Sequence, residues 1–214
     1  MTVVTIDSDE LLADVHRPAG GARGTIVLAH GAGGDRNSAI LRAYADELSS
    51  RGWVVARIDL PYRRRRPKGP PSPSTAAADR DGIRTAIEAL RGDTEGPVLA
   101  GGHSYGGRQA SMLVAEDASV ADGLLLSSYP LHPPGKPDRL RTEHLPSLAV
   151  PTVVVHGHSD PFATSTELAD AVALIPSDTR IVEIRGAGHD LRPDRTPTAP
   201  LAADAVDEFW SVGA

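Results

Sequence analysis

The sequence predicts an α/β fold in which a mostly parallel central sheet lies between two layers of helices. Short apolar runs such as Thr25–His30 and Thr152–Gly157 have the length and composition of strands that are covered on both faces. Segments with helical spacing of apolar residues alternate with these runs, which is typical of parallel sheets with crossover helices. The 214 residues, 40% hydrophobic and 23% charged, suffice for one well-buried domain, and we expect residues 1–214 to form it.

The N-terminal residues differ from the rest, because apolar and polar side chains alternate there. Val3–Ile6 and Leu11–Val15 are expected to form an antiparallel hairpin at one edge of the sheet. Further strands are expected at Thr25–His30, Trp53–Leu60, Val98–Gly101, Gly123–Ser128, Thr152–Gly157 and Arg180–Ile184. Helices are expected at Asn37–Arg51, residues 75–91, residues 106–116, Ser165–Leu174 and Leu201–Val212.

Two proline-rich segments are predicted to be irregular. Prolines and like charges crowd Pro61–Pro73, where the run Arg63–Arg66 is either an anion-attracting rim or a solvated stretch of charge. Tyr129–Val150 contains five prolines and is too short for a cap of several helices. We therefore expect no large cap domain, and a pocket that is shallow and open.

The composition disfavours several classes of function. Without cysteine there is no thiol nucleophile and no thiolate metal site, and we expect neither a metal ion nor another cofactor. A net charge of −6 is unlike that of a general nucleic-acid-binding domain. No run approaches membrane-spanning length and the N-terminus lacks the pattern of a secretory signal. We expect a cytoplasmic protein with a small-molecule substrate and neither membrane nor nucleic acid as partner; the oligomeric state is left open.

The segment Gly102-His103-Ser104-Tyr105-Gly106 has the pattern of a nucleophile elbow. A serine at a sharp turn between strand and helix has a strained backbone and a hydroxyl exposed above the sheet. Such a turn needs small neighbours, and glycines occupy both flanking positions. The pattern alone is weak, but the apolar run before it and the helix formers after it place Ser104 at such a turn.

A serine nucleophile needs a histidine base, and usually a carboxylate that orients the histidine. Asp160 follows the strand Thr152–Gly157, and His189 follows the last predicted strand. The carboxyl ends of parallel strands meet at one edge of a sheet, so Ser104, Asp160 and His189 are expected to come together there. We predict these three residues as a catalytic triad.

The glycine-rich loop that starts at His30 is the second half of this prediction. Three glycines between His30 and Asp35 allow the backbone to turn and present its amides. The backbone N–H groups of Ala32 and Tyr105 are therefore predicted to form an oxyanion hole. Residues near the site that we expect to line a substrate pocket are His30, Tyr62, His103, Tyr129 and His132.

With these features in place, residues 20–212 resemble the α/β-hydrolase superfamily. That resemblance implies a three-layer sandwich and a hydrolytic activity. A narrower resemblance, to the hydrolase-like family that includes testis-expressed protein thirty and is related to dienelactone hydrolases, rests on Ser128-Tyr129-Pro130-Leu131-His132-Pro133, Lys136, Leu140-Arg141, Leu145 and Pro151-Thr152. Dienelactone hydrolases use a cysteine nucleophile, and this chain has none.

The resulting hypothesis is a serine hydrolase that cleaves carboxylic esters or thioesters of small acyl groups through an acyl-enzyme. Two alternatives stay open at this point. The chain could be a hydrolase-shaped interaction module whose site is unused, with the arginine run as its binding surface. It could also be a lyase or perhydrolase that uses the same triad, because fold and triad do not fix the reaction.

Overall fold

The apolar runs of the sequence form the strands of one sheet in the computed structural model, which describes residues 1–133 and 135–210. The order of the eight strands is β1-β2-β4-β3-β5-β6-β7-β8. Only the pairs β1/β2 and β2/β4 are antiparallel, and all other neighbours are parallel. The strands are β1 (Thr2–Asp7), β2 (Leu12–Arg17), β3 (Gly24–Ala29), β4 (Trp53–Ile58), β5 (Val98–His103), β6 (Gly123–Ser127), β7 (Thr152–Gly157) and β8 (Thr179–Ile184).

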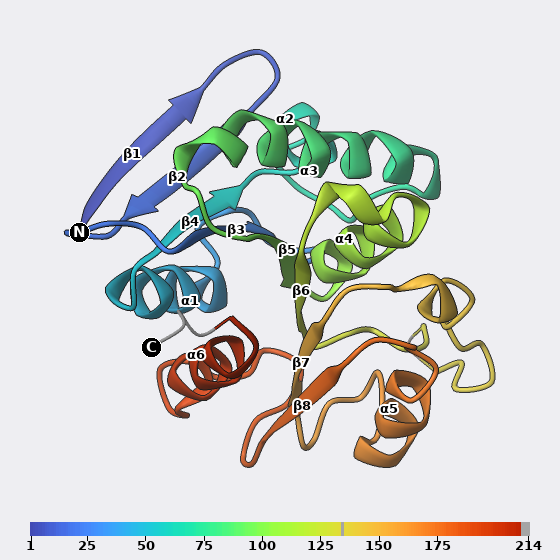
Figure 1. Cartoon of the computed structure of the whole chain (residues 1–214). Helices are drawn as coiled ribbons and strands as arrows, with labels where there is room; N and C mark the ends of the chain where they lie inside the picture. The colour runs from blue at the N-terminus through green and yellow to red at the C-terminus, as the bar shows by residue number, and fades with distance from the viewer. Residues whose placement is uncertain (134, 211–214) are drawn as a thin grey trace.

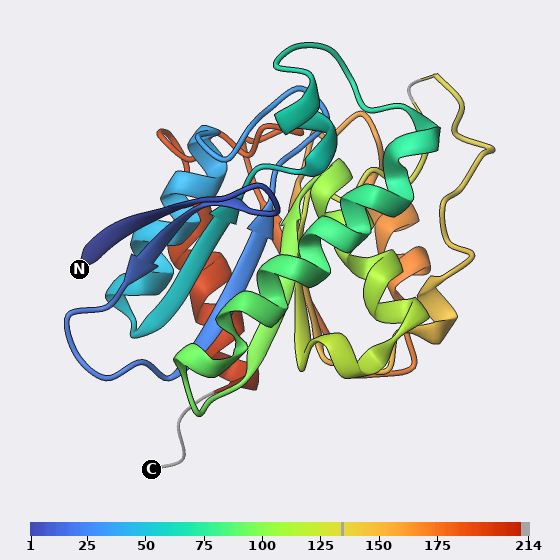
Figure 2. The same cartoon turned by 90° about the horizontal axis from the view of Figure 1, so that it is seen from above.

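Helices cover both faces of this sheet (Figure 1 and Figure 2). One hydrophobic cluster joins α1 and α6 to one face, and a second joins α3, α4 and α5 to the other. The helices are α1 (Ala39–Ser50), α2 (Pro61–Arg65), α3 (Ala76–Leu90), α4 (Tyr105–Glu116), α5 (Ser165–Val172) and α6 (Thr198–Phe209). Short 3-10 turns lie at η1 (Pro73–Thr75), η2 (Arg91–Asp93), η3 (Ala118–Val120) and η4 (Leu145–Ser147).

The predicted fold class is confirmed. The inner strands β3 to β7 are buried along their whole length, except at His103, as expected for strands with helices on both faces. The N-terminal hairpin forms the antiparallel edge, and its outer strand β1 is almost entirely exposed. The last helix starts and ends earlier than predicted, and the predicted end at Val212 lies outside the described residues.

The prediction of an irregular chain is wrong for Pro61–Arg65, which forms helix α2. Proline is tolerated in the first turn of a helix, where its missing N–H would have no partner. The arginines lie in the last turn, where positive charge is favourable toward the helix dipole. Like charges in a row therefore do not break this short helix.

The segment between β6 and β7 matches its prediction more closely. Among its described residues, which leave out Pro134, regular structure is limited to the turn η4. Its described residues form no helical cap. In the described part of the chain, we find no helix long and apolar enough to cross a membrane.

Candidate active site

Ser104 lies between β5 and α4 in a backbone conformation that side chains rarely adopt. Its φ is 52° and its ψ is −114°, a strain that typically costs about 1–3 kcal/mol. The flanking glycines make this turn possible. A Cβ at Gly102 would lie 2.0 Å from the carbonyl oxygen of Ala29, and one at Gly106 would lie 2.4 Å from the same atom.

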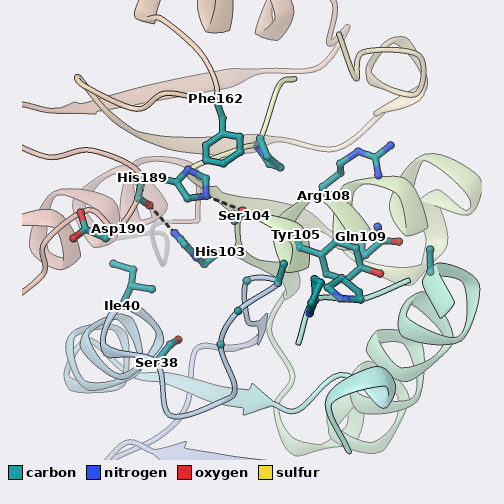
Figure 3. Close-up of a pocket in the computed structure, with 18 of the residues that line it drawn as sticks. Ser38, Ile40, His103, Ser104, Tyr105, Arg108, Gln109, Phe162, His189 and Asp190 are labelled. Atoms are coloured by element: carbon teal, nitrogen blue, oxygen red, sulfur yellow. Dashed lines mark hydrogen bonds between the residues drawn. The ribbon is translucent and has the colours of Figure 1, made fainter. Parts of the chain in front are cut away.

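The loops after β7 and β8 bring Asp160 and His189 to this turn. The Nε2 atom of His189 lies 2.8 Å from the Ser104 hydroxyl, and its Nδ1 atom lies 2.8 Å from Oδ2 of Asp160. Figure 3 shows the bond from Ser104 to His189 at the centre of the cavity. The Asp160 carboxylate is fully buried, whereas 23% of the His189 side chain is exposed. The structure thus joins the three residues that the sequence singled out in one hydrogen-bonded chain.

The surroundings of Asp160 leave one of its oxygens for the imidazole. The backbone N–H of Phe162 donates to Oδ1 at 2.9 Å, so that Oδ2 faces His189. A carboxylate only accepts hydrogen bonds, which places the imidazole proton on Nδ1 and leaves Nε2 to accept from Ser104. The Phe162 ring packs on the imidazole, with 4.3 Å between the ring centroids. Phe162 was not predicted, although it lies two positions after Asp160.

His103 supports His189 from the other side. Its Nε2 atom donates to the backbone carbonyl of His189 at 2.8 Å, and the ring centroids are 5.2 Å apart. Burial is the main reason why the pKa of His103 falls to about 4, so the ring is neutral at neutral pH. A neutral ring beside His189 avoids a repulsive charge when that imidazole takes up a proton.

The loop after β3 carries the Ala32 amide, and His30 fixes its orientation. The carbonyl oxygen of Gly31 accepts from the Gly34 N–H at 3.0 Å and from Nδ1 of His30 at 2.8 Å. The other nitrogen of His30 accepts from the Leu60 N–H at 3.2 Å, and burial lowers the pKa of this histidine. In a trans peptide the C=O and the next N–H point in opposite directions, so the Ala32 N–H points away from these donors.

Tyr62 and Arg63 of α2 hold the same loop through its next carbonyls. The Tyr62 hydroxyl donates to the Ala32 carbonyl at 2.9 Å. The guanidinium of Arg63 donates to the carbonyls of Ala32, Gly34 and Gly69 at 3.2, 2.7 and 3.3 Å. Only 7% of Arg63 is exposed, so the first residue of the arginine run is neither a solvated charge nor part of a rim.

Asp79 of α3 ties this loop support to the helix that follows Ser104. Its buried carboxylate accepts from the Tyr62 backbone N–H at 2.9 Å and from the Tyr105 hydroxyl at 2.7 Å. Burial and the bond to Asp79 raise the pKa of Tyr105, so the phenol keeps its proton. Within the described residues, neither the Ala32 nor the Tyr105 backbone N–H donates to a protein group, and both residues line the cavity.

The cavity beside Ser104 has a volume of about 900 Å³. Residues 70–73, between α2 and α3, form one wall of the cavity. The lining residues are Gly31, Ala32, Gly33, Gly34, Ser38, Ala39, Ile40, Pro70, Pro71, Ser72, Pro73, Ala76, His103, Ser104, Tyr105, Arg108, Gln109, Pro130, Arg141, Phe162, His189 and Asp190.

Of the five predicted pocket residues, only His103 lines this cavity. His30 and Tyr62 lie behind the Ala32 loop and support it, as described above. Tyr129 is buried and donates to the Arg141 carbonyl at 2.6 Å, whereas His132 is buried against the Pro133 carbonyl. These four side chains are thus supporting groups rather than walls of the cavity. In the described residues, no three His, Cys, Asp or Glu side chains are grouped as metal ligands.

A family model described as an alpha/beta hydrolase domain matches residues 22–207. The fold is similar to a serine hydrolase without lid from Xanthomonas campestris, with a TM-score of 0.76 and 17% identity over 100% of this chain and 96% of that one. Dienelactone hydrolase from Anabaena variabilis gives a TM-score of 0.73 and 23% identity over 98% and 95% of the two chains. Est1E from Butyrivibrio proteoclasticus gives a TM-score of 0.71 and 17% identity over 97% of this chain and 96% of that one.

Proposed function

The chain belongs to the alpha/beta hydrolase domain family, and from that premise we propose that it is a serine hydrolase of carboxylic esters or thioesters. One observation carries the proposal. Ser104 stands in a strained turn at a large cavity and is hydrogen-bonded to His189, which is hydrogen-bonded to buried Asp160. A hydroxyl held against an imidazole nitrogen that can accept its proton is activated for attack on a carbonyl carbon.

Acylation follows from the positions of these groups. The Ser104 oxygen attacks the carbonyl carbon while Nε2 of His189 takes the hydroxyl proton. The negative charge that develops on the carbonyl oxygen is stabilised by the Ala32 and Tyr105 N–H groups, which have no protein acceptor among the described residues. His189 then returns the proton to the leaving alcohol or thiol, and Ser104 is left as its ester. Asp160 stabilises the imidazolium between these two transfers.

Deacylation uses the same groups in the reverse sense. A water molecule loses a proton to Nε2 of His189 and attacks the acyl carbon, and the same two amides stabilise the second oxyanion. The proton then passes to the Ser104 oxygen, which releases the carboxylic acid. The Gly31 and Ala32 carbonyls are held from behind by His30 and Tyr62, so the loop keeps its amide in place through both steps.

The test is covalent labelling with a fluorophosphonate probe, together with turnover of 4-nitrophenyl butyrate. We expect labelling of the native protein at Ser104, found by peptide mass spectrometry, and none in Ser104→Ala. Ser74→Ala changes an exposed serine that does not line the cavity and should be labelled like the native protein. A native protein that is folded by circular dichroism yet neither labelled nor active would contradict the proposal.

A further inference from the structure

Two arginines that line the cavity have no carboxylate partner. Arg108 lies on α4 one turn after Ser104, and Arg141 belongs to the segment between β6 and β7. Among the described residues neither takes part in an ion pair. Other partly buried arginines are paired with carboxylates in the structure, for example Arg23 with Asp207 and Arg36 with Asp59.

The guanidinium of Arg108 lies near the Tyr129 hydroxyl, but it leaves one of its donors unpaired among the described residues. Its Nε atom is buried and has no partner among the described residues. A buried donor of this kind is costly to leave unpaired, and native proteins rarely do so without a reason. The backbone N–H of Arg108 donates to the Ser104 carbonyl at 2.9 Å. This bond holds the Cα of Arg108 at a fixed distance from Ser104.

Arg141 is held in place by its own backbone rather than by a counter-charge. Its N–H donates to the Leu131 carbonyl at 2.8 Å, and its carbonyl accepts from the Tyr129 hydroxyl at 2.6 Å. One side-chain nitrogen donates to the Pro130 carbonyl at 3.1 Å. Burial, and then the positive charge of Arg108, lower the pKa of Arg141, because two like charges share this end of the cavity.

The charge of the cavity is therefore uneven. Figure 3 shows Asp190 beside His189 and Arg108 on the opposite side of Ser104. The exposed carboxylate of Glu143, two positions after Arg141, forms no ion pair with it, although its charge acts to raise the pKa of Arg141. An anion would be repelled from the Asp190 side and attracted to the arginine side, even though the protein as a whole carries a net charge of −6.

Between these ends the walls are small or apolar. More than half of the lining residues are either glycine, alanine or proline or one of the two larger apolar residues Ile40 and Phe162. Such walls fit a hydrocarbon body, and a guanidinium matches the planar oxygens of a carboxylate or phosphate. We propose that Arg108 and Arg141 bind the anionic group, a carboxylate or a phosphate, of an ester or thioester substrate whose reacting carbonyl lies at Ser104.

This inference rests on the proposed function and gives it a substrate class. The proposed anion site is not the run Arg63–Arg66, which the sequence indicated as either an anion-attracting rim or a solvated stretch of charge. Arg63 is occupied by backbone carbonyls, and Arg64, Arg65 and Arg66 do not line the cavity. The charge that faces a bound substrate comes from two arginines that are 33 positions apart in the sequence (141 minus 108).

The first test compares a matched pair of substrates, mono-4-nitrophenyl adipate and its methyl ester, which differ in one negative charge. We expect kcat/KM to favour the anionic ester, and Arg108→Gln and Arg141→Gln each to lower the anionic-to-neutral ratio by about 10- to 100-fold. Arg141→Lys keeps the charge and should lower the ratio less than Arg141→Gln. Arg65→Gln removes an exposed arginine that does not line the cavity, and should leave the ratio as in the native protein.

The second test measures binding without turnover. Calorimetry with Ser104→Ala should detect adipate or butyl phosphate, and the tighter ligand identifies the preferred anion. Additional replacement of Arg108 and Arg141 by Gln should weaken this binding at least tenfold. A ratio near one in the native enzyme, with neither anion bound by Ser104→Ala, would overturn the inference and leave labelling of Ser104 intact. Arginine-dependent anion binding in a native protein that is neither labelled nor active would instead overturn the hydrolase proposal alone.

Discussion

At the Ser104 end of the cavity each side chain of the proposed triad has a hydrogen-bond partner, whereas at the arginine end two guanidinium groups form no ion pair among the described residues. Ser104, His189 and Asp160 form one chain of bonds, and His103 adds another to the His189 backbone. Satisfied groups cannot reorient without losing bonds, so they hold reacting atoms in place. Unsatisfied groups at a cavity are available to a ligand.

The same contrast separates two arginines of this chain. Arg63 donates to several backbone carbonyls and is almost fully buried, which makes it part of the support of the Ala32 loop. Arg108 is surrounded by fewer partners, and its Nε is left without one. The charge of an arginine alone therefore does not identify it as a ligand-binding residue. An arginine is available to a ligand when the fold leaves some of its hydrogen-bond donors unpaired. The predictions below would break or refine this distinction.

The largest effect is expected for Asp160→Asn. With its oxygen toward the Phe162 N–H, the new amide would donate to Nδ1 of His189, and Nε2 would then carry the proton and could not accept one from Ser104. We expect kcat to fall by about 10³- to 10⁴-fold for the anionic and the neutral ester alike. Steady-state kinetics with both adipate esters checks this.

The control for this prediction is Asp194→Asn, in the same loop as His189 but with 73% of its side chain exposed. It should retain native kinetics. A kcat for Asp160→Asn within tenfold of native would show that Asp160 does not set the imidazole tautomer. A loss confined to the anionic ester would mean that the two ends of the cavity are not separate in function.

The meeting of the proposed triad residues could be predicted from the sequence, whereas the arginine end of the cavity could not. Ser104, Asp160 and His189 each follow a strand, and the parallel topology alone predicts that they meet. Gly102 and Gly106 indicated a tight turn, which their contacts with Ala29 explain. These features are local patterns or consequences of strand order, and both can be read from one chain.

The remainder depends on contacts between distant segments. Arg141 and Arg108 meet only because the irregular segment after β6 folds back over α4, and no spacing in the sequence encodes that path. In the sequence only the run Arg63–Arg66 pointed to an anion site, with a solvated stretch of charge as the alternative, because its charges are adjacent. Helix α2 instead turns Arg63 inward, toward carbonyls of a loop 29 positions earlier, at Gly34.

A smaller effect on the reaction end is expected for Tyr62→Phe. The change removes the hydroxyl that donates to the Ala32 carbonyl and leaves the ring in place. Loss of a whole oxyanion donor lowers kcat by about 10²- to 10³-fold. Tyr62→Phe leaves the Ala32 N–H in place but holds it less firmly, so kcat should fall by only about 10-fold for both esters. Affinity for a boronic acid, which forms a tetrahedral adduct, should fall by a similar factor, whereas KM changes less.

Tyr129→Phe is the matched change at the arginine end. Its hydroxyl holds the Arg141 backbone rather than the Ala32 loop. We therefore expect it to lower the anionic-to-neutral ratio more than it lowers boronic acid affinity. If Tyr62→Phe altered the anionic-to-neutral ratio, the Tyr62 hydroxyl would not act on the Ser104 end alone. If Tyr129→Phe altered the affinity for the boronic acid, the Tyr129 hydroxyl would not act on the arginine end alone.

The smallest effect concerns His103, which lies beside His189, and His144, which lies near the Tyr129 ring and is bonded to Ser111 of α4. The pKa of each histidine lies at about 4 instead of 6.5. Burial is the main cause for both. For His144 the charge of Arg108 is the second cause, whereas Arg108 is not among the causes for His103. Arg108→Gln should therefore raise the pKa of His144 and leave that of His103 unchanged, as measured by imidazole NMR shifts between pH 3.5 and about 7.

The same shifts fix the sign of the pH dependence of stability. The unfolded chain takes up these protons near pH 6.5 and the folded protein only near pH 4, so the stability from each neutral ring is complete above pH 6.5 and is lost as the pH falls toward 4. Arg108→Gln should reduce the difference between the folded and the unfolded pKa of His144. The unfolding free energy of this variant should therefore fall less steeply between pH 6.5 and 4 than that of the native protein. Urea unfolding at several pH values measures the slope. An unchanged slope and an unchanged His144 titration would place the Arg108 charge too far from His144 to act on it, and would weaken the view that this guanidinium is held at the cavity.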